Sequence, residues 1–162
     1  MTFHTQSFAN RFSAMGDMAE GIFDLVYQGK THALGLNRVW QNGDRLYMGQ
    51  MTPSMKATPD RMVKDHFAEV MGIGRDQTGK FKDVKLLPLL DWDMHIGPVT
   101  IFIYDSSNHR YWEANVKDWQ LACEKHGERK AFHDGPEYWA LPVWAFPVEA
   151  VDAPSIEPDT TA

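Results

Sequence analysis

The stretch TPDRMVKDHFAEVMGIG, residues 58–74, decides the fold that this sequence predicts. Thr58–Val63 and Phe67–Ile73 are typical of two strands, and the polar residues Lys64-Asp65-His66 between them suit a short turn. Gly72 and Gly74 interrupt the second strand near its end. We therefore predict a β-hairpin here.

Helical and strand patterns alternate on both sides of this hairpin. The predicted elements are a helix over Met15–Tyr27, a helix over Asp76–Trp92 that Pro88 kinks or splits, a buried strand over Val99–Tyr104, a strand over Arg110–Asn115, a helix over Lys117–Lys125 and an extended aromatic segment over Glu137–Phe146. This order predicts an α/β fold with a central mixed β-sheet flanked by helices.

Length and composition favour one globular domain. The chain has 162 residues, of which 43% are hydrophobic, so it can form a single sizeable core. We predict that this domain covers residues 1–144 and that residues 145–162, which contain four acidic and no basic side chains, form an acidic, disordered tail. Cys123 is the only cysteine, which excludes an internal disulfide and suits a reducing cytoplasm. No apolar run reaches the roughly 18 residues that a membrane span requires.

The charge of the chain bears on a nucleic-acid partner. The net charge of −6 argues against nucleic-acid binding at first. Between Lys56 and Lys85, however, there are seven basic and five acidic residues, and a bound cation would cancel two of those acids, Asp60 and Glu69. The expected phosphate-binding surface is therefore local and modest.

Asp60 and Glu69 are the candidate metal ligands. Successive side chains of a strand alternate between its faces, so Glu69 and Met71 share one face while Val70 points to the other. If Asp60 lies on the adjacent strand and faces the same way as Glu69, two carboxylates converge and repel each other. A hard divalent cation, Mg²⁺ or Mn²⁺, relieves that repulsion, and the backbone carbonyl of Val70 completes the predicted set. Glu20, on the first predicted helix, is a candidate third carboxylate.

These residues resemble the PD-(D/E)xK nuclease superfamily, in which a helix carries Glu, one strand carries Pro-Asp, the next carries Glu-x-Lys and a following helix often carries Gln. The resemblance runs from about Met15 to Tyr104. Gly16–Gly21, Thr58–Asp60 and Glu69–Gln77 look most like small phage-encoded endonucleases and Holliday junction resolvases. It implies a restriction-endonuclease-like core, Mg²⁺-dependent cleavage of DNA, branched DNA included, a homodimer, and a place in the host cytoplasm if the gene is carried by a phage.

The residue that departs from this pattern is Met71, which stands where the superfamily has lysine. Members can supply that lysine from the following helix. Gln77 and Lys80 would share one face of the helix expected there, so Lys80 is the first candidate, Lys82 the second and Lys85 the third. We therefore assign catalytic roles to Lys80, Lys82 and Gln77, beside Glu20, Asp60 and Glu69. Contacts with DNA are assigned to Arg75, Lys56 and Lys85.

Two other functions remain open at this stage. A protein of the same fold that binds DNA or a regulatory partner without catalysis would explain both Met71 and the acidic charge. A structural partner that docks another protein through the aromatic segment from Tyr138 to Phe146 is the second alternative. Cys123, His126 and His133 lack a fourth ligand and do not fit a standard zinc site.

Overall fold

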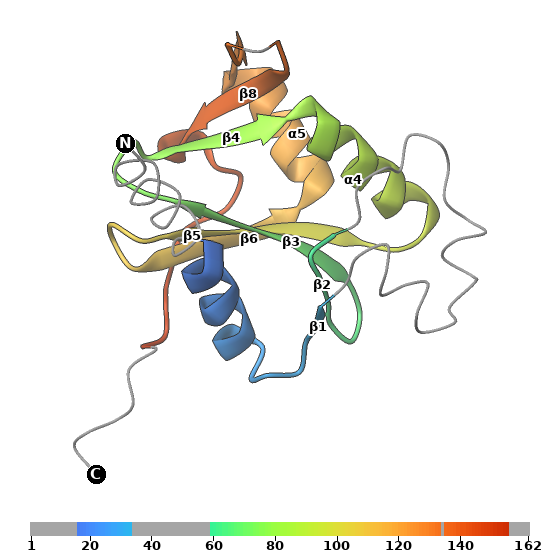
Figure 1. The fold of residues 1–162 in the computed structure, drawn as a ribbon, viewed down its shortest axis with the longest axis vertical. Helices are drawn as coiled ribbons and strands as arrows, with labels where there is room; N and C mark the ends of the chain where they lie inside the picture. The colour runs from blue at the N-terminus through green and yellow to red at the C-terminus, as the bar shows by residue number, and fades with distance from the viewer. Residues whose placement is uncertain (1–15, 34–58, 134, 156–162) are drawn as a thin grey trace, which may run out of the picture.

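A mixed six-stranded β-sheet forms the centre of the computed structural model, which describes residues 16–33, 59–133 and 135–155 (Figure 1). Its strands lie in the order β1-β2-β3-β5-β6-β9. Their bounds are His32–Ala33 for β1, Arg61–Met62 for β2, Phe67–Ile73 for β3, Val99–Asp105 for β5, Arg110–Asn115 for β6 and Val151–Asp152 for β9. The predicted α/β class with a mixed sheet and flanking helices is confirmed.

The strands β3 and β5 are parallel neighbours at the middle of this sheet. They pair along their whole length, from Phe67 opposite Val99 to Ile73 opposite Asp105. Parallel strands need a long crossover, and here it contains β4 (Thr78–Lys82) and the helix α4 (Asp83–His95). The other pairings of the sheet are antiparallel.

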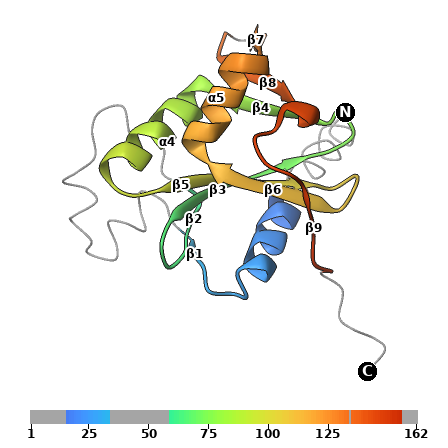
Figure 2. The ribbon, with the colours of Figure 1, turned by 180° about the vertical axis from the view of Figure 1, so that it is seen from behind.

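Helices cover both faces of the sheet. One helix, residues 16–26, lies on one face, while α4 and α5 (Val116–His126) lie on the other (Figures 1 and 2). The helix 16–26 buries Ile22 and Phe23 against Phe102 of β5. On the opposite face, Trp92 of α4 and Trp119 of α5 are fully buried in the larger apolar cluster. The sheet is thus the middle layer of three.

The segment 76–92 departs from the prediction of a single helix. Thr78–Lys82 is the strand β4, which pairs with β8 (Glu137–Pro142) and, through it, with β7 (Glu128–Ala131) in a separate three-stranded sheet. The physical reason is a period of two: Gly79 and Phe81 are buried, and Lys80 and Lys82 are exposed. The helix begins only at Asp83 and continues through Pro88.

The other predicted elements agree with the structure. The hairpin of β2 and β3, the buried strand β5, the strand β6 and the helices 16–26 and α5 all lie where the sequence predicts them, with bounds that differ by a few residues. The extended part of the aromatic segment is β8. Among the described residues, no helix is both long and apolar enough to cross a membrane.

The expected tail from residue 145 onward is wrong for residues 145–155. Phe146 is 9% exposed and packs edge-on against Trp112 and Trp119, with ring centroids 4.7 and 4.8 Å away. Further on, β9 pairs with β6 at Arg110 and Tyr111. The prediction failed because it weighed the acidic composition and not the aromatic ring of Phe146. Residues 156–162 lie outside the described part.

Phe146→Ala should therefore lower the free energy of unfolding by about 3–5 kcal/mol, because the substitution leaves a cavity between two tryptophan rings. The matched control is Trp144→Ala, since Trp144 is 73% exposed and its truncation should change stability by no more than about 0.5 kcal/mol. Urea unfolding measures both. Equal effects of the two substitutions would show that residue 146 does not belong to the core.

Candidate metal and phosphate site

Asp60 lies at the open edge of β3. The strand β2 pairs with β3 only at Phe67 and Ala68, and among the described strands none continues this pairing beyond Ala68. The backbone N–H of Val70 points to this edge and donates a hydrogen bond of 3.0 Å to Oδ2 of Asp60. Because the N–H and C=O of one strand residue point to the same side, the carbonyl of Val70 faces this edge as well. Asp60 and the Val70 carbonyl are thus neighbours.

Glu69 is buried on the α4 side of the same strand, with 5% of its side chain exposed. Its Oε2 accepts a hydrogen bond of 3.1 Å from Nζ of Lys85, whereas its Oε1 is buried and has no partner among the described residues. Burial, reinforced by the nearby carboxylate of Asp60 and only partly offset by Lys85, raises the pKa of Glu69 to about 8. Two acidic groups that face each other in this way require a shared proton or a cation.

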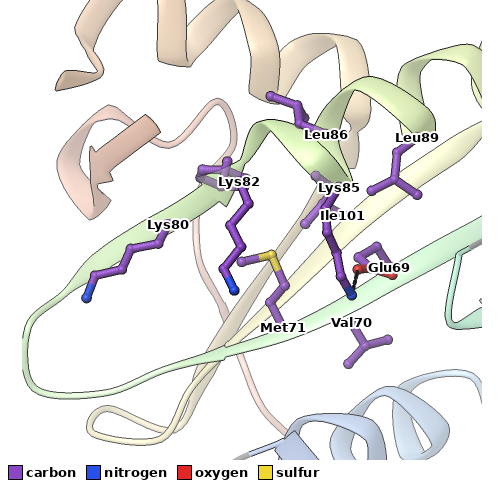
Figure 3. A pocket seen from close by; sticks show the side chains of 10 residues that line it. Glu69, Val70, Met71, Lys80, Lys82, Lys85, Leu86, Leu89 and Ile101 are labelled. Carbon is purple, nitrogen blue, oxygen red and sulfur yellow. Dashed lines mark hydrogen bonds and ion pairs between the residues drawn. The ribbon is translucent and has the colours of Figure 1, made fainter. Parts of the chain in front are cut away.

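Three lysines line a cavity with Glu69 on the α4 side of the sheet. Lys80 and Lys82 project from the exposed face of β4, and Lys85 projects from the first turn of α4 (Figure 3). With Glu69 they provide the charged lining of a cavity of about 200 Å³. Its apolar lining consists of Val70, Met71, Phe81, Leu86, Leu89 and Ile101. Negative charge raises the pKa of Lys85, chiefly that of Glu69, so this ammonium stays protonated.

Lys85 takes the position that the sequence assigned first to Lys80. Lys80 lies on a strand and not on a helix, and its Nζ is 3.9 Å from Oδ2 of Asp76. Lys82 lies between Lys80 and Glu69 in Figure 3, and its Nζ is 5.1 Å from the ring centroid of Phe132. The order of the three candidates therefore changes, because the helix starts at Asp83 and places Lys85 beside Glu69. Recognising from the sequence that the helix begins at Asp83 would have identified Lys85 as the lysine beside Glu69.

Glu20 lies on the other side of the sheet from Glu69. Arg61 pairs with Ala68 in the sheet, and the side chain of Ala68 faces the helix 16–26. Arg61 therefore lies on this face, and its Nη2 is 3.5 Å from Oε1 of Glu20. Burial raises the pKa of Glu20, Arg61 opposes this rise, and Asp60 adds to it. Glu20 is thus near Asp60 but is already paired with a guanidinium, so the structure does not bring it onto the carboxylate face of Glu69.

Gln77 does not face the carboxylates, and its predicted role there is wrong. It lies in the turn between β3 and β4 with φ = 50°. Its Nε2 donates to Oδ1 of Asp105 at 3.1 Å and to the carbonyl of Gly74 at 2.8 Å, and its Oε1 accepts from Arg110. The buried Asp105, which sequence reasoning missed, holds this side chain in place. Arg75 is exposed in the same turn, and Lys56 lies outside the described residues.

The donor set around Asp60 fits a hard divalent cation better than any softer metal. It offers the carboxylate of Asp60, the free Oε1 of Glu69 and the carbonyl of Val70, which are oxygens only. Within residues 16–33, 59–133 and 135–155, no group of three or more His, Cys, Asp or Glu side chains could hold a metal. One or two carboxylates are the usual protein ligands of Mg²⁺, which keeps several of its waters.

Comparison with known proteins returned no match: no protein-family model, curated protein or solved structure is significantly similar to the chain. The fold and the site define the chain only as an α/β domain with a buried Glu69 carboxylate beside the half-buried Asp60 and a neighbouring lysine cluster.

The raised pKa of Glu69 makes a prediction about pH. Its folded value of about 8 exceeds the unfolded value, so the protein without metal should lose stability as the pH rises from about 5 through 8. Glu69→Gln does not titrate, so its melting temperature relative to that of the parent should increase over this range. Thermal unfolding in EDTA at several pH values measures the difference. The exposed Glu128→Gln is the control, and a Glu69→Gln curve parallel to the parent's would contradict the burial argument.

Proposed function

We propose that this protein is a Mg²⁺-dependent endodeoxyribonuclease of the PD-(D/E)xK type that acts in the cytoplasm. The observation that carries the proposal is the buried Oε1 of Glu69, which has no partner among the described residues and faces the carboxylate of Asp60. A buried carboxylate oxygen that accepts no hydrogen bond is costly, and a cation on this side of Glu69 would remove the cost. Among the described residues, Asp60 lies just before the strand β2 and Glu69 lies on β3, so the hairpin carries both carboxylates, whereas the strand β4 follows β3 where the resemblance implies a helix.

The two oxygens of Glu69 have different surroundings, which suits this chemistry. Oε1 would bind the cation together with Asp60 and the carbonyl of Val70, while Oε2 keeps its hydrogen bond with Lys85. When bound, Mg²⁺ supplies an activated water and neutralises charge on a phosphate oxygen. Lys85 holds a positive charge beside this position, where it stabilises the charge that grows on the phosphate during cleavage. Lys85 would therefore replace the lysine that is missing at Met71.

DNA is the proposed substrate, and branched DNA is the first form to test. Lys80 and Lys82 are exposed beside the cavity and would bind phosphates of the backbone, as would Arg75. Because this basic surface is small on a chain of net charge −6, one subunit would bind weakly. A homodimer would double the phosphate contacts and present two sites to a junction.

A catalytically inactive binding protein of the same fold is the second candidate, and Met71 favours it. The buried Glu69 beside Asp60 favours the enzyme, since a scaffold without metal gains nothing from a second carboxylate that raises the pKa of Glu69. Metal binding separates the two candidates.

Asp60→Asn and Glu69→Gln should each abolish Mn²⁺ binding measured by calorimetry, because each removes one of the two charges that hold a hard cation. Circular dichroism should show that both variants remain folded. Glu20→Gln is the matched control, because Glu20 is paired with Arg61 on the face of the sheet opposite Glu69, and it should retain most of the affinity. Full Mn²⁺ affinity in both the Asp60 and the Glu69 variant would contradict the proposed metal site.

Lys85→Met should lower the rate of DNA cleavage by about 100-fold or more, while Mn²⁺ still binds at saturating concentration, because the ammonium acts on the transition state. Lys80→Met should lower the rate less, since Lys80 is half exposed and lies next to Asp76. The assay uses a labelled four-way junction and its matching linear duplex, with Mg²⁺ or EDTA. Parental rates in Lys85→Met would refute the role of this lysine, and a parent that binds Mn²⁺ but cuts neither DNA would favour the inactive binding protein.

A further inference from the structure

Another carboxylate, the largely buried one of Glu113, lies on the face of the sheet that the helix 16–26 covers. It is on β6 opposite Phe102, and 16% of its side chain is exposed. Its Oε1 accepts a hydrogen bond of 2.5 Å from the hydroxyl of Tyr27, and its Oε2 accepts one of 2.6 Å from the hydroxyl of Thr100. Nε2 of His66 lies 3.2 Å from the same Oε2. Both oxygens of Glu113 are therefore used.

The three partners of Glu113 come from three different parts of the chain. Tyr27 directly follows the helix 16–26, Thr100 is on the central strand β5, and His66 is the last residue of the turn between β2 and β3. His66 is thus the link between Glu113 and the hairpin that carries Asp60 at one end and Glu69 at the other.

Charge strengthens the link between Glu113 and His66. The hydrogen bond that His66 donates to Glu113, with help from Asp65 at 2.9 Å, raises the pKa of His66 against the opposing effect of burial. Burial would raise the pKa of Glu113, but the bonds from His66, Thr100 and Tyr27 outweigh it, so this pKa is lowered. Tyr27 and Tyr111, the other titratable groups that face Glu113, each have their pKa raised by burial and by that carboxylate. The pair is therefore most strongly bound as imidazolium and carboxylate.

Such an ion pair is not the most stabilising choice of side chains for this position. Replacing a buried ion pair by apolar side chains is often neutral or stabilising, so its presence suits a need for one fixed arrangement. The position of Asp60 depends on such a fixed arrangement. Asp60 precedes the two-residue strand β2, and the N–H of Val70 holds its carboxylate to β3. A small rotation of the hairpin would separate Asp60 from Glu69.

We propose that Glu113 is a positioning residue, which binds His66 and so fixes the β2–β3 hairpin in the arrangement that keeps Asp60 beside the Val70 edge and Glu69. Glu113 acts through His66 and does not touch the cation or the substrate. The effect on metal binding rests on the function proposed above, whereas the effect on the hairpin does not. Exchange of the Val70 amide in EDTA reports on the hairpin alone, because its N–H donates to Asp60 and no metal is then bound.

The test compares Glu113→Gln with the exposed Glu128→Gln as control. Glu113→Gln should make hydrogen exchange at the Val70 amide faster in EDTA and should weaken Mn²⁺ binding by about 10-fold, as the loss of an outer partner of a metal ligand does. Unchanged Val70 exchange and unchanged Mn²⁺ affinity would overturn the proposal. If the parent itself fails to bind Mn²⁺, the proposed function fails, and the Val70 exchange alone decides the positioning role in either direction.

His66→Gln supplies a readout that a general loss of stability would not move, and it serves if Glu113→Gln does not fold. The pKa of His66 is raised in the folded protein, so the link is complete below about pH 6.5 and is lost as the pH rises through the folded value. Protection of Val70, corrected for intrinsic exchange, should therefore fall over this range more steeply in the parent than in His66→Gln. Glu69 titrates in both proteins and cancels in the comparison. Identical pH profiles would overturn the role of the His66–Glu113 pair.

Discussion

The parallel pairing of β3 with β5 is the constraint on which the rest of the structure depends. It fixes one side of β3 along all seven residues, whereas β2 covers the other side only at Phe67 and Ala68. The uncovered edge is what allows the carboxylate of Asp60 to bind the Val70 N–H. The same parallel pairing demands a crossover, and that crossover brings the first turn of α4, with Lys85, over the face of β3 that carries Glu69.

Glu69 and Glu113 show how the sheet tolerates buried acids on both of its faces. Glu113 has three hydrogen-bond partners and its pKa is lowered, so it is a satisfied carboxylate that links elements. Glu69 has one lysine on one oxygen and an acidic neighbour near the other, and its pKa is raised to about 8. The difference is one of partners and not of burial alone. An acid whose environment opposes its charge is a candidate for binding or catalysis, whereas a satisfied acid is a candidate for positioning.

The sequence predicts those parts of the fold in which local pattern and tertiary environment agree. The β-branched run of β5 is buried on both faces, so its pattern leaves no alternative to a central strand. The segment 76–92 was misread because the leucines of α4 suggest a helix, and the alternation of Gly79 and Phe81 with lysines before it is too short to stand out. Asp60 and Glu69 were predictable as neighbours because a hairpin brings them together. Glu113 and Lys85 were not, because their partners are 47 and 16 residues away and depend on how the layers pack.

The position of Met71 follows from the same geometry. Met71 is two residues after Glu69 on β3, so both side chains face the cavity, and Met71 contributes to its apolar lining. A lysine at this position would add a fourth ammonium next to Lys80, Lys82 and Lys85 and would repel all of them. An apolar side chain there instead keeps the surroundings of Glu69 poorly solvated, which strengthens its attraction to Lys85. A lysine next to Glu69 therefore has to lie beside Oε2, and Lys85 of α4 lies there although β3 carries no lysine.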